Sequence, residues 1–377
     1  MLLIVATTTI IAVLSVMVGY TALKKGEMDL QSFMFAEAAS LIVKDVFPAR
    51  DLANLREVRE FLESQTAVSL CMEYKVKCKN DASSYNASQI PVLDFTKDHV
   101  LGNPGTPIRL YYPHKDHEEP LGVLLWLHGG GFVLGSVEAD DYKAALLANR
   151  TDLAVVSVDY RLAPEHPYPA GLDDASDVLT WLLEAEEPRE RFNLRADRVF
   201  IGGESAGATL ALAAVLKNLG SSSNSDPVRG MLLVYPPLDM NYSLESYIHN
   251  AKTNGVLTDS QMAWFWQLYG GKGNATMEYC LDSDPLFCPG LASPDLLSHP
   301  SFPSTYLHLA VHDVLYSEGM AFADQLKLAQ GTDKVQVSTY QHSVHGFFFV
   351  SMFPEHAAAI ATATRQLVDE YGRLEAA

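Results

Sequence analysis

A serine in a glycine-flanked turn is the residue of this chain best placed to do chemistry. Gly203-Glu204-Ser205-Ala206-Gly207 fits the G-x-S-x-G pattern, in which a sharp strand-to-helix turn projects the serine hydroxyl above a parallel sheet. The pentapeptide alone would equally suit a packing turn. However, the apolar residues before it and the alanine-rich residues after it are typical of a buried strand and a helix. We therefore predict that Ser205 is a nucleophile.

A serine hydroxyl reacts readily only when a base takes its proton and an acid orients that base. In the strand–turn–helix setting of this motif, the partners follow later strands in the chain order Ser, Asp, His. Asp313 follows a strand predicted over 306–311, and His345 follows one predicted over 335–340. Because the carboxyl ends of parallel strands meet at one edge of a sheet, we expect Ser205, Asp313 and His345 to converge.

Two other residues compete for these roles. Asp239 also follows a predicted strand, over 231–235, and could be the acid. His342 shares a loop with His345 and could be the base. Both types of residue are more often found in loops bonded to nearby backbone, which is the interpretation that we favour.

Three consecutive glycines predict a site for negative charge. His128-Gly129-Gly130-Gly131-Phe132 directly follows an apolar strand predicted over 122–127. Glycines leave the backbone N–H groups unhindered, so the amides of Gly130 and Gly131, together with that of Ala206, can bind an oxyanion. We interpret His128 as a structural support of this loop, and the combination of the loop with the serine turn as an acyl-transfer site.

The elements that position these residues follow an α/β pattern. Near-continuous apolar strands separated by helices predict a mostly parallel central sheet with helices on both faces. Antiparallel edge strands are expected within 90–113. About seventy residues separate the strands at 235 and 306, and the aromatic-rich segment 262–269 within them suits either core filling or an apolar lid wall. The strands of the parallel part are expected over 122–127, 154–158, 199–201, 231–235, 306–311 and 335–340.

The first 23 residues contain no charged side chain and are long enough to cross a bilayer as a helix. We favour a retained membrane anchor over a cleaved signal segment, and both over a buried helix. Lys24 and Lys25 would favour a cytosolic orientation. Four N-x-S/T sequons favour a lumenal or extracellular one. We therefore expect a protein anchored in the membrane of the endoplasmic reticulum with a lumenal catalytic domain or, alternatively, a secreted protein. The sequons are Asn86, Asn149, Asn241 and Asn274.

The charge and cysteine content of the chain argue against some classes of binding partner and cofactor. The net charge of −19 and the pI of 4.9 argue against nucleic-acid binding, which needs clustered basic residues. The four cysteines form two close couples, Cys71 with Cys78 and Cys280 with Cys288, which suit either short disulfides or free thiols. No metal-binding spacing is present, so we expect neither a metal nor an organic cofactor.

Five motifs in this order resemble the hormone-sensitive-lipase-like family of α/β-hydrolases, the HGGG esterases. They are HGGGF at 128–132, DYRLAPEHPYPAGLDD at 159–174, GESAG at 203–207, HDVLYSEG at 312–319 and HGF at 345–347. The resemblance implies an α/β-hydrolase fold with a helical cap, and hydrolysis of small or medium acyl esters by Ser205, His345 and Asp313. Two positions depart from the family pattern, Ala208 in place of a second glycine and Glu204 in place of aspartate.

The resemblance also implies a division of the chain. Residues 24–100 would form cap helices and a linker, and 101–377 the catalytic domain, with a cap insertion at about 241–300. An amidase or deacetylase would use the same residues on an amide substrate. A ligand-binding receptor of this fold is a further alternative, although such receptors lack one member of the triad, and here all three are present.

Overall fold

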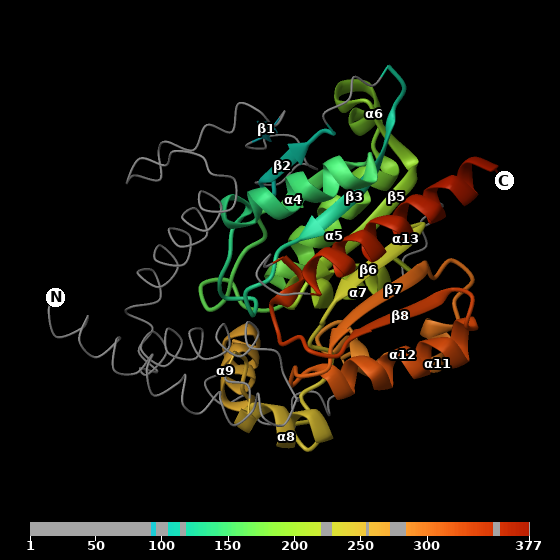
Figure 1. Ribbon diagram of the computed structural model, residues 1–377. Helices are drawn as coiled ribbons and strands as arrows, with labels where there is room; N and C mark the ends of the chain where they lie inside the picture. The colour runs from blue at the N-terminus through green and yellow to red at the C-terminus, as the bar shows by residue number, and fades with distance from the viewer. Residues whose placement is uncertain are drawn as a thin grey trace, which may run out of the picture.

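The computed structural model describes residues 92–95, 105–113, 118–219, 228–253, 256–271, 284–349 and 355–376. Its described part is built on an eight-stranded sheet with the order β1-β2-β4-β3-β5-β6-β7-β8 (Figure 1). Strands β3 to β8 pair in parallel, and β1 and β2 add an antiparallel edge. This arrangement confirms the predicted α/β class and the edge strands. The strands are β1 (Val92–Phe95), β2 (Ile108–Tyr111), β3 (Leu121–Leu127), β4 (Ala154–Val158), β5 (Leu194–Glu204), β6 (Gly230–Val234), β7 (Ser304–Ala310) and β8 (Val335–Tyr340).

The central strands are apolar throughout because both faces of the sheet are covered. Every residue of β3, β4 and β6 is buried. Successive side chains of a strand point to opposite faces. Accordingly, Leu125 and Leu127 of β3 join one hydrophobic cluster, while Leu124 and Trp126 join the other.

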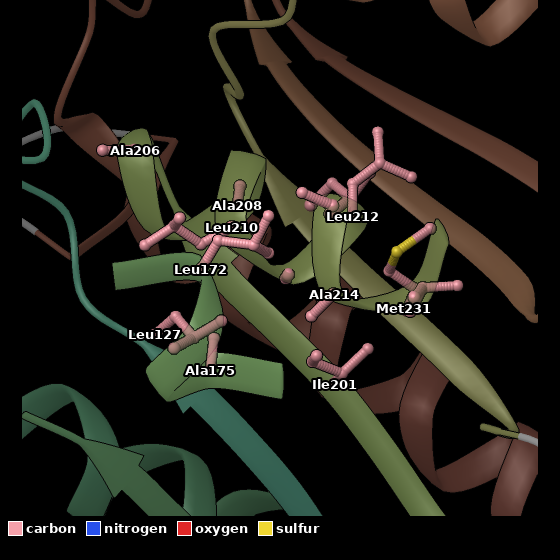
Figure 2. Packing of buried hydrophobic residues seen from close by; sticks show 14 of the residues in the cluster. Leu127, Leu172, Ala175, Ile201, Ala206, Ala208, Leu210, Leu212, Ala214 and Met231 are labelled. Carbon is pink, nitrogen blue, oxygen red and sulfur yellow. The ribbon is translucent and has the colours of Figure 1, made fainter. Parts of the chain in front are cut away.

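Helices cover each face of the sheet. On one face lie α5 (Ala170–Glu184), α7 (Ala206–Leu219) and α12 (Tyr316–Gln330), whose apolar residues belong to the larger cluster. Figure 2 shows Leu172 of α5 and Leu210 of α7 packed against Leu127 of β3. On the opposite face lie α4 (Val137–Thr151) and the C-terminal α13 (His356–Ala376). Short elements complete the layers, namely α6 (Glu187–Phe192) and the 3-10 turn η5 (Phe347–Phe349).

The segment between β6 and β7 carries α8 (Glu245–Thr253), α9 (Asp259–Tyr269), η4 (Pro289–Leu291) and α11 (Pro294–Leu297). Helix α9 begins with a capping box, in which Thr258 and Gln261 satisfy each other's backbone N–H groups. Its aromatic residues fill core and also line a cavity. Trp266 is fully buried beside Phe132, whereas Phe265 lines a cavity. That this segment acts as a cap remains a prediction.

Several expectations fall on residues outside the described ranges. These include the apolar segment 1–23, the cap and linker segment predicted over 24–100 apart from β1, and the sequons at Asn86 and Asn274. No helix in the described ranges is both long and apolar enough to span a membrane. Of the other sequons, Asn149 lies on α4, and the side-chain oxygen of Asn241 accepts hydrogen bonds from Ser243.

Of the four cysteines, the structure describes Cys288. Cys288 is buried and disulfide-bonded. Cys71, Cys78 and Cys280 lie outside the described residues. Pairing within the couple Cys280 and Cys288 therefore remains a prediction.

Candidate active site

Ser205 occupies a strained turn between β5 and α7. Its backbone has a φ of 51°, in the left-handed region, and its N–H donates to Val234 O at 2.9 Å. The flanking glycines are required by close packing. A Cβ at Gly203 would lie 2.4 Å from the carbonyl carbon of Gly207, and one at Gly207 would lie 2.0 Å from Leu127 O. The turn therefore admits no larger residue at either position, and it lifts the serine above the end of the sheet.

The structure brings Ser205 together with the predicted base and acid. The Oγ of Ser205 lies 3.0 Å from Nε2 of His345, and Nδ1 of His345 lies 2.6 Å from Oδ2 of Asp313. The other carboxylate oxygen of Asp313 accepts a hydrogen bond from the N–H of Leu315 at 3.1 Å. Asp313 is only 2% exposed. This chain of contacts can transfer a proton from the serine hydroxyl to the imidazole and hold the resulting imidazolium.

The two rival residues are bonded elsewhere. The carboxylate of Asp239 accepts from the N–H of Met240 at 2.6 Å. His342 is exposed, and its backbone N–H donates to Glu355. The imidazole of His345 therefore pairs with Asp313, and the interpretation of Asp239 and His342 as loop residues agrees with these contacts.

The glycine triplet forms a tight loop beside the serine. Gly130 has a φ of 125° and Gly131 a φ of 61°, values that favour glycine. The carbonyl of Gly130 accepts from the N–H groups of Val133 and Leu134 at 3.1 and 2.8 Å, which closes the loop. Within the described residues, the N–H groups of Gly130 and Gly131 donate to no other backbone carbonyl. Within the part of the chain that the structure describes, these two groups can therefore bind a substrate oxygen.

A cavity of about 270 Å³ opens above these residues. Its wall is mostly apolar, and helix α9 contributes Met262 and Phe265. The ring of Phe265 packs so closely on the glycine loop that a Cβ at Gly131 would lie 2.2 Å from it. The cavity is lined by Gly129, Gly130, Gly131, Phe132, Leu134, Glu204, Ser205, Tyr235, Pro237, Val256, Leu257, Gln261, Met262, Phe265, His345 and Gly346.

Comparison with known proteins agrees with this architecture. Residues 124–349 match a protein family described as having the alpha/beta hydrolase fold. The chain belongs to the hormone-sensitive-lipase-like family of α/β-hydrolases. It is 34% identical to the esterase LipI of Mycobacterium tuberculosis over 263 residues, which cover 69% of this chain and 75% of the relative. It is 32% identical to an ethyl acetate hydrolase of Pseudomonas putida over 332 residues, 87% of this chain and 94% of the relative.

Two further matches bear on activity and fold. The chain is 32% identical to the arylacetamide deacetylase of the rabbit, Oryctolagus cuniculus, over 166 residues, which cover 43% of this chain and 41% of the relative. Among solved structures, an esterase from Pyrobaculum calidifontis superposes with a TM-score of 0.68 at 28% identity, over 84% of this chain and 94% of the esterase.

In this α/β-hydrolase, His128 supports the glycine loop from below. Its ring stacks on Tyr160 with the centroids 4.3 Å apart, and its Nδ1 lies 2.8 Å from Gly129 O. The hydroxyl of Tyr160 in turn donates to His128 O at 2.8 Å. Because the partners of His128 are Gly129 and Tyr160, whereas Ser205 pairs with His345, its place suits a structural role rather than a chemical one.

Sequence reasoning missed two residues that hold the loops after β6 and β7, which carry Asp239 and Asp313. From α8, the side-chain amide of Asn250 donates to the carbonyls of Val311 and Asp313 at 3.0 and 2.9 Å. From α12, the buried Glu318 accepts from the N–H of Leu238 at 3.2 Å, and burial raises its pKa well above the usual range. Asn250 belongs to no motif, and Glu318 lies within the motif at 312–319 without a role that the sequence alone reveals, because each contact depends on how distant elements pack.

A second missed group surrounds Glu204. Its carboxylate contacts the ammonium of Lys143 on α4 and accepts a hydrogen bond from the hydroxyl of Tyr235 at 2.9 Å. Burial alone would lower the pKa of Lys143, but the carboxylates of Asp140 and Glu204 outweigh burial and raise it. Burial also raises the pKa of Tyr235 well above its ordinary value, so its hydroxyl stays protonated. No cluster of metal-ligating side chains occurs in the ranges that the structure describes.

Proposed function

We propose that this chain is a serine carboxylic ester hydrolase that cleaves esters of small and medium acyl groups through an acyl-enzyme. The single observation that carries this proposal is the pair of contacts at His345, 3.0 Å to Ser205 and 2.6 Å to Asp313. Membership of a family whose relatives include an esterase and an ethyl acetate hydrolase supports it.

In the proposed reaction, the Oγ of Ser205 attacks the ester carbonyl while Nε2 of His345 takes its proton. Asp313 holds the imidazole through Nδ1 and stabilises its positive charge. The carbonyl electron pair moves to oxygen, and the resulting oxyanion is bound by the N–H groups of Gly130, Gly131 and Ala206. Each such donor can contribute about 3 to 4 kcal/mol to the stability of the transition state.

The tetrahedral intermediate then collapses. The bond to the alcohol oxygen breaks as His345 gives its proton to that oxygen, which leaves the acyl group on Ser205. A water molecule attacks the acyl-enzyme with the same proton transfers in reverse order. The carboxylic acid leaves and Ser205 regains its proton.

The cavity supports a small or medium acyl group. Its volume is about 270 Å³ and most of its wall is apolar, which suits a short hydrocarbon chain. Phe265 closes the side next to the glycine loop, where it packs on Gly131.

The proposal is tested with purified protein and a series of p-nitrophenyl esters from acetate to octanoate. We expect hydrolysis of the shorter esters, fluorophosphonate labelling of Ser205, and loss of both in Ser205→Ala. Threonine at the exposed Ser243 provides a control that keeps both and preserves the sequon at Asn241. A folded wild-type protein that neither hydrolyses the esters nor reacts with the fluorophosphonate would refute the proposal.

A second candidate activity is hydrolysis of aryl amides. The match to rabbit arylacetamide deacetylase favours it, because the same residues cleave an amide when His345 protonates the leaving nitrogen. Paired p-nitrophenyl acetate and p-nitroacetanilide separate the two. Faster cleavage of the ester at equal concentration supports the first activity, and comparable cleavage of the anilide the second.

We also propose that residues 1–23 anchor the protein in the membrane with the catalytic part on the lumenal side. The uncharged N-terminal segment supports the anchor, and the four sequons support the lumenal orientation. In cells, the protein should remain with membranes after carbonate washing and lose mass on glycosidase treatment. An unchanged mass would contradict the lumenal orientation.

A further inference from the structure

A mostly buried group of charged side chains surrounds Glu204, the residue before Ser205, and has no part in the proposed reaction; the side chain of Lys143 is 22% exposed. Lys143 on α4 contacts the carboxylate of Glu204 and pairs with Asp140 at 2.7 Å. Asp140 also accepts a hydrogen bond from the indole of Trp126 at 2.7 Å. Asp140 and Glu204 are 3% and 8% exposed. Buried charges persist only where they are paired, so Lys143 neutralises a carboxylate directly next to the proposed nucleophile.

The second oxygen of Glu204 reaches the imidazole of His345 through one aromatic ring. It accepts a hydrogen bond from the hydroxyl of Tyr235 at 2.9 Å. The ring of Tyr235 packs on that of His345 with the centroids 4.6 Å apart. The backbone N–H of Tyr235 donates to His308 O at 2.9 Å, which fixes the other end of the residue. The orientation of the ring that faces His345 is therefore set by Glu204.

Glu204 also contacts the glycine loop. A Cβ added at Gly129 would lie 3.0 Å from Cγ of Glu204 and 3.2 Å from its Oε1. The side chain of Glu204 thus touches the loop that would bind the oxyanion. Through its hydrogen bond with Tyr235, it is also linked to the base, His345. A shorter acidic residue would have one methylene less to span these contacts.

On the basis of the proposed esterase function, we propose that Lys143, Glu204 and Tyr235 form a positioning chain that holds the imidazole of His345, and that the charge of Lys143 sets the pH at which this imidazole becomes available as a base. None of the three takes part in bond making or breaking. They act through His345.

The charges around His345 determine the direction in which each substitution should shift the pH dependence of activity. Asp313 contacts the imidazole directly, and Glu204 lies beyond the ring of Tyr235, with Lys143 and Asp140 behind it. Loss of Lys143 leaves Glu204 without its counter-charge, which favours the imidazolium. Loss of the charge of Glu204 does the reverse. At the effective dielectric of a partly buried site, one such charge moves a titration by about 0.5 to 1 pH unit.

The experiment measures kcat/KM for p-nitrophenyl acetate from pH 5 to 9 in the wild type, Lys143→Met, Glu204→Gln and the double variant. We expect the rise of kcat/KM with pH to shift to higher pH by about 0.5 to 1 unit in K143M, and to lower pH by a similar amount in E204Q. In the double variant the two changes cancel, and the rise returns close to the wild-type position. A loss of packing alone would not give shifts of opposite sign.

A matched control changes the same charge elsewhere. Lys217 pairs with Asp173 at 2.6 Å near the far end of α7 from Ser205, where both side chains are exposed. Lys217→Met should leave the rise in place. Tyr235→Phe keeps the ring and removes only the bond to Glu204, and we expect kcat to fall about three- to tenfold with KM close to the wild-type value.

The titration of His345 by ¹³C NMR, assigned with His345→Gln, gives the same shifts without turnover. If the wild type does not hydrolyse esters, the proposed function is wrong, and the NMR titrations still decide this inference. Should K143M fail to fold, E204Q and the double variant carry the test. Titrations of His345 that coincide in all folded variants would overturn the proposal.

Discussion

Replacement of Asp313 by asparagine should remove catalysis while preserving the fold. The carboxylate of Asp313 has two partners, the N–H of Leu315 at 3.1 Å and Nδ1 of His345 at 2.6 Å. In Asp313→Asn, the side-chain oxygen is needed by the N–H of Leu315, so the NH₂ group faces Nδ1. Because that group is a donor, Nδ1 must become an acceptor, and the imidazole proton moves to Nε2.

This change of tautomer deprives Ser205 of its base. With a proton on Nε2, His345 cannot accept the proton of Ser205, and the Oγ of Ser205 loses its base. The substitution is isosteric, so we expect an unchanged circular dichroism spectrum and a loss in kcat of about 10⁴-fold, which corresponds to about 5 kcal/mol in the activation free energy.

The assay is steady-state hydrolysis of p-nitrophenyl acetate at pH 7.5, with Asp239→Asn as the matched control. Asp239 follows β6 as Asp313 follows β7, but its carboxylate accepts from Met240 N, whereas Nδ1 of His345 pairs with Asp313. The control should retain kcat within about twofold. A D313N protein that keeps a tenth of the wild-type kcat, or a D239N protein that loses as much as D313N, would refute the reasoning.

Three further predictions follow from single contacts. In Gly131→Ala, the new Cβ would lie 2.2 Å from the ring of Phe265, at a residue with a φ of 61°, so the proposed oxyanion donor must move. We expect kcat for p-nitrophenyl acetate to fall about 10²- to 10³-fold. An unchanged kcat would exclude this loop as the oxyanion site. Phe265→Ala should enlarge the cavity, raising kcat/KM for the octanoate relative to the acetate; an unaltered ratio across the ester series would show that Phe265 does not limit chain length. Burial lowers the pKa of His308 from 6.5 to about 4, so the unfolded state takes up its proton first as the pH falls. The free energy of unfolding should therefore decline between about pH 6.5 and 4, by about 3 kcal/mol from this residue, and urea titrations should show a weaker decline in His308→Gln.

The sequence was sufficient to predict the sheet and the meeting of the three residues at the candidate site. Long apolar runs such as β3 and β4 identify buried parallel strands, and the residues that follow such strands must lie at one edge. That rule brought Ser205, Asp313 and His345 together although 140 residues separate the first from the last. The glycines at 203 and 207 were informative because the packing of the turn excludes side chains there.

The ends of a strand were predicted less well where its polar residues bond to a helix that is distant in the sequence. The strand expected over 199–201 is β5 and begins at Leu194, because its charged residues have partners on α13. Arg195 pairs with Glu375 at 2.8 Å, and Arg198 donates to Leu374 O at 2.8 Å. Read along the chain alone, such residues resemble a surface loop.

The supporting residues could not be found from local patterns. Lys143 lies on an ordinary amphipathic helix, and its contact with Glu204 joins positions 61 residues apart. The amide of Asn250 likewise meets the loop of Asp313 only because α8 packs there. Periodicity shows which face of a helix is buried, but not which residue of another element it meets.

The central claim is that Ser205 carries the acyl group during turnover. Rapid acid quench of the enzyme mixed with p-nitrophenyl acetate, followed by peptide mass spectrometry, measures this directly. We predict the added mass of one acetyl group on the peptide that contains Ser205, and no such peptide from Ser205→Ala. An acetyl group on a different residue during turnover, or turnover that persists in Ser205→Ala, would contradict the account.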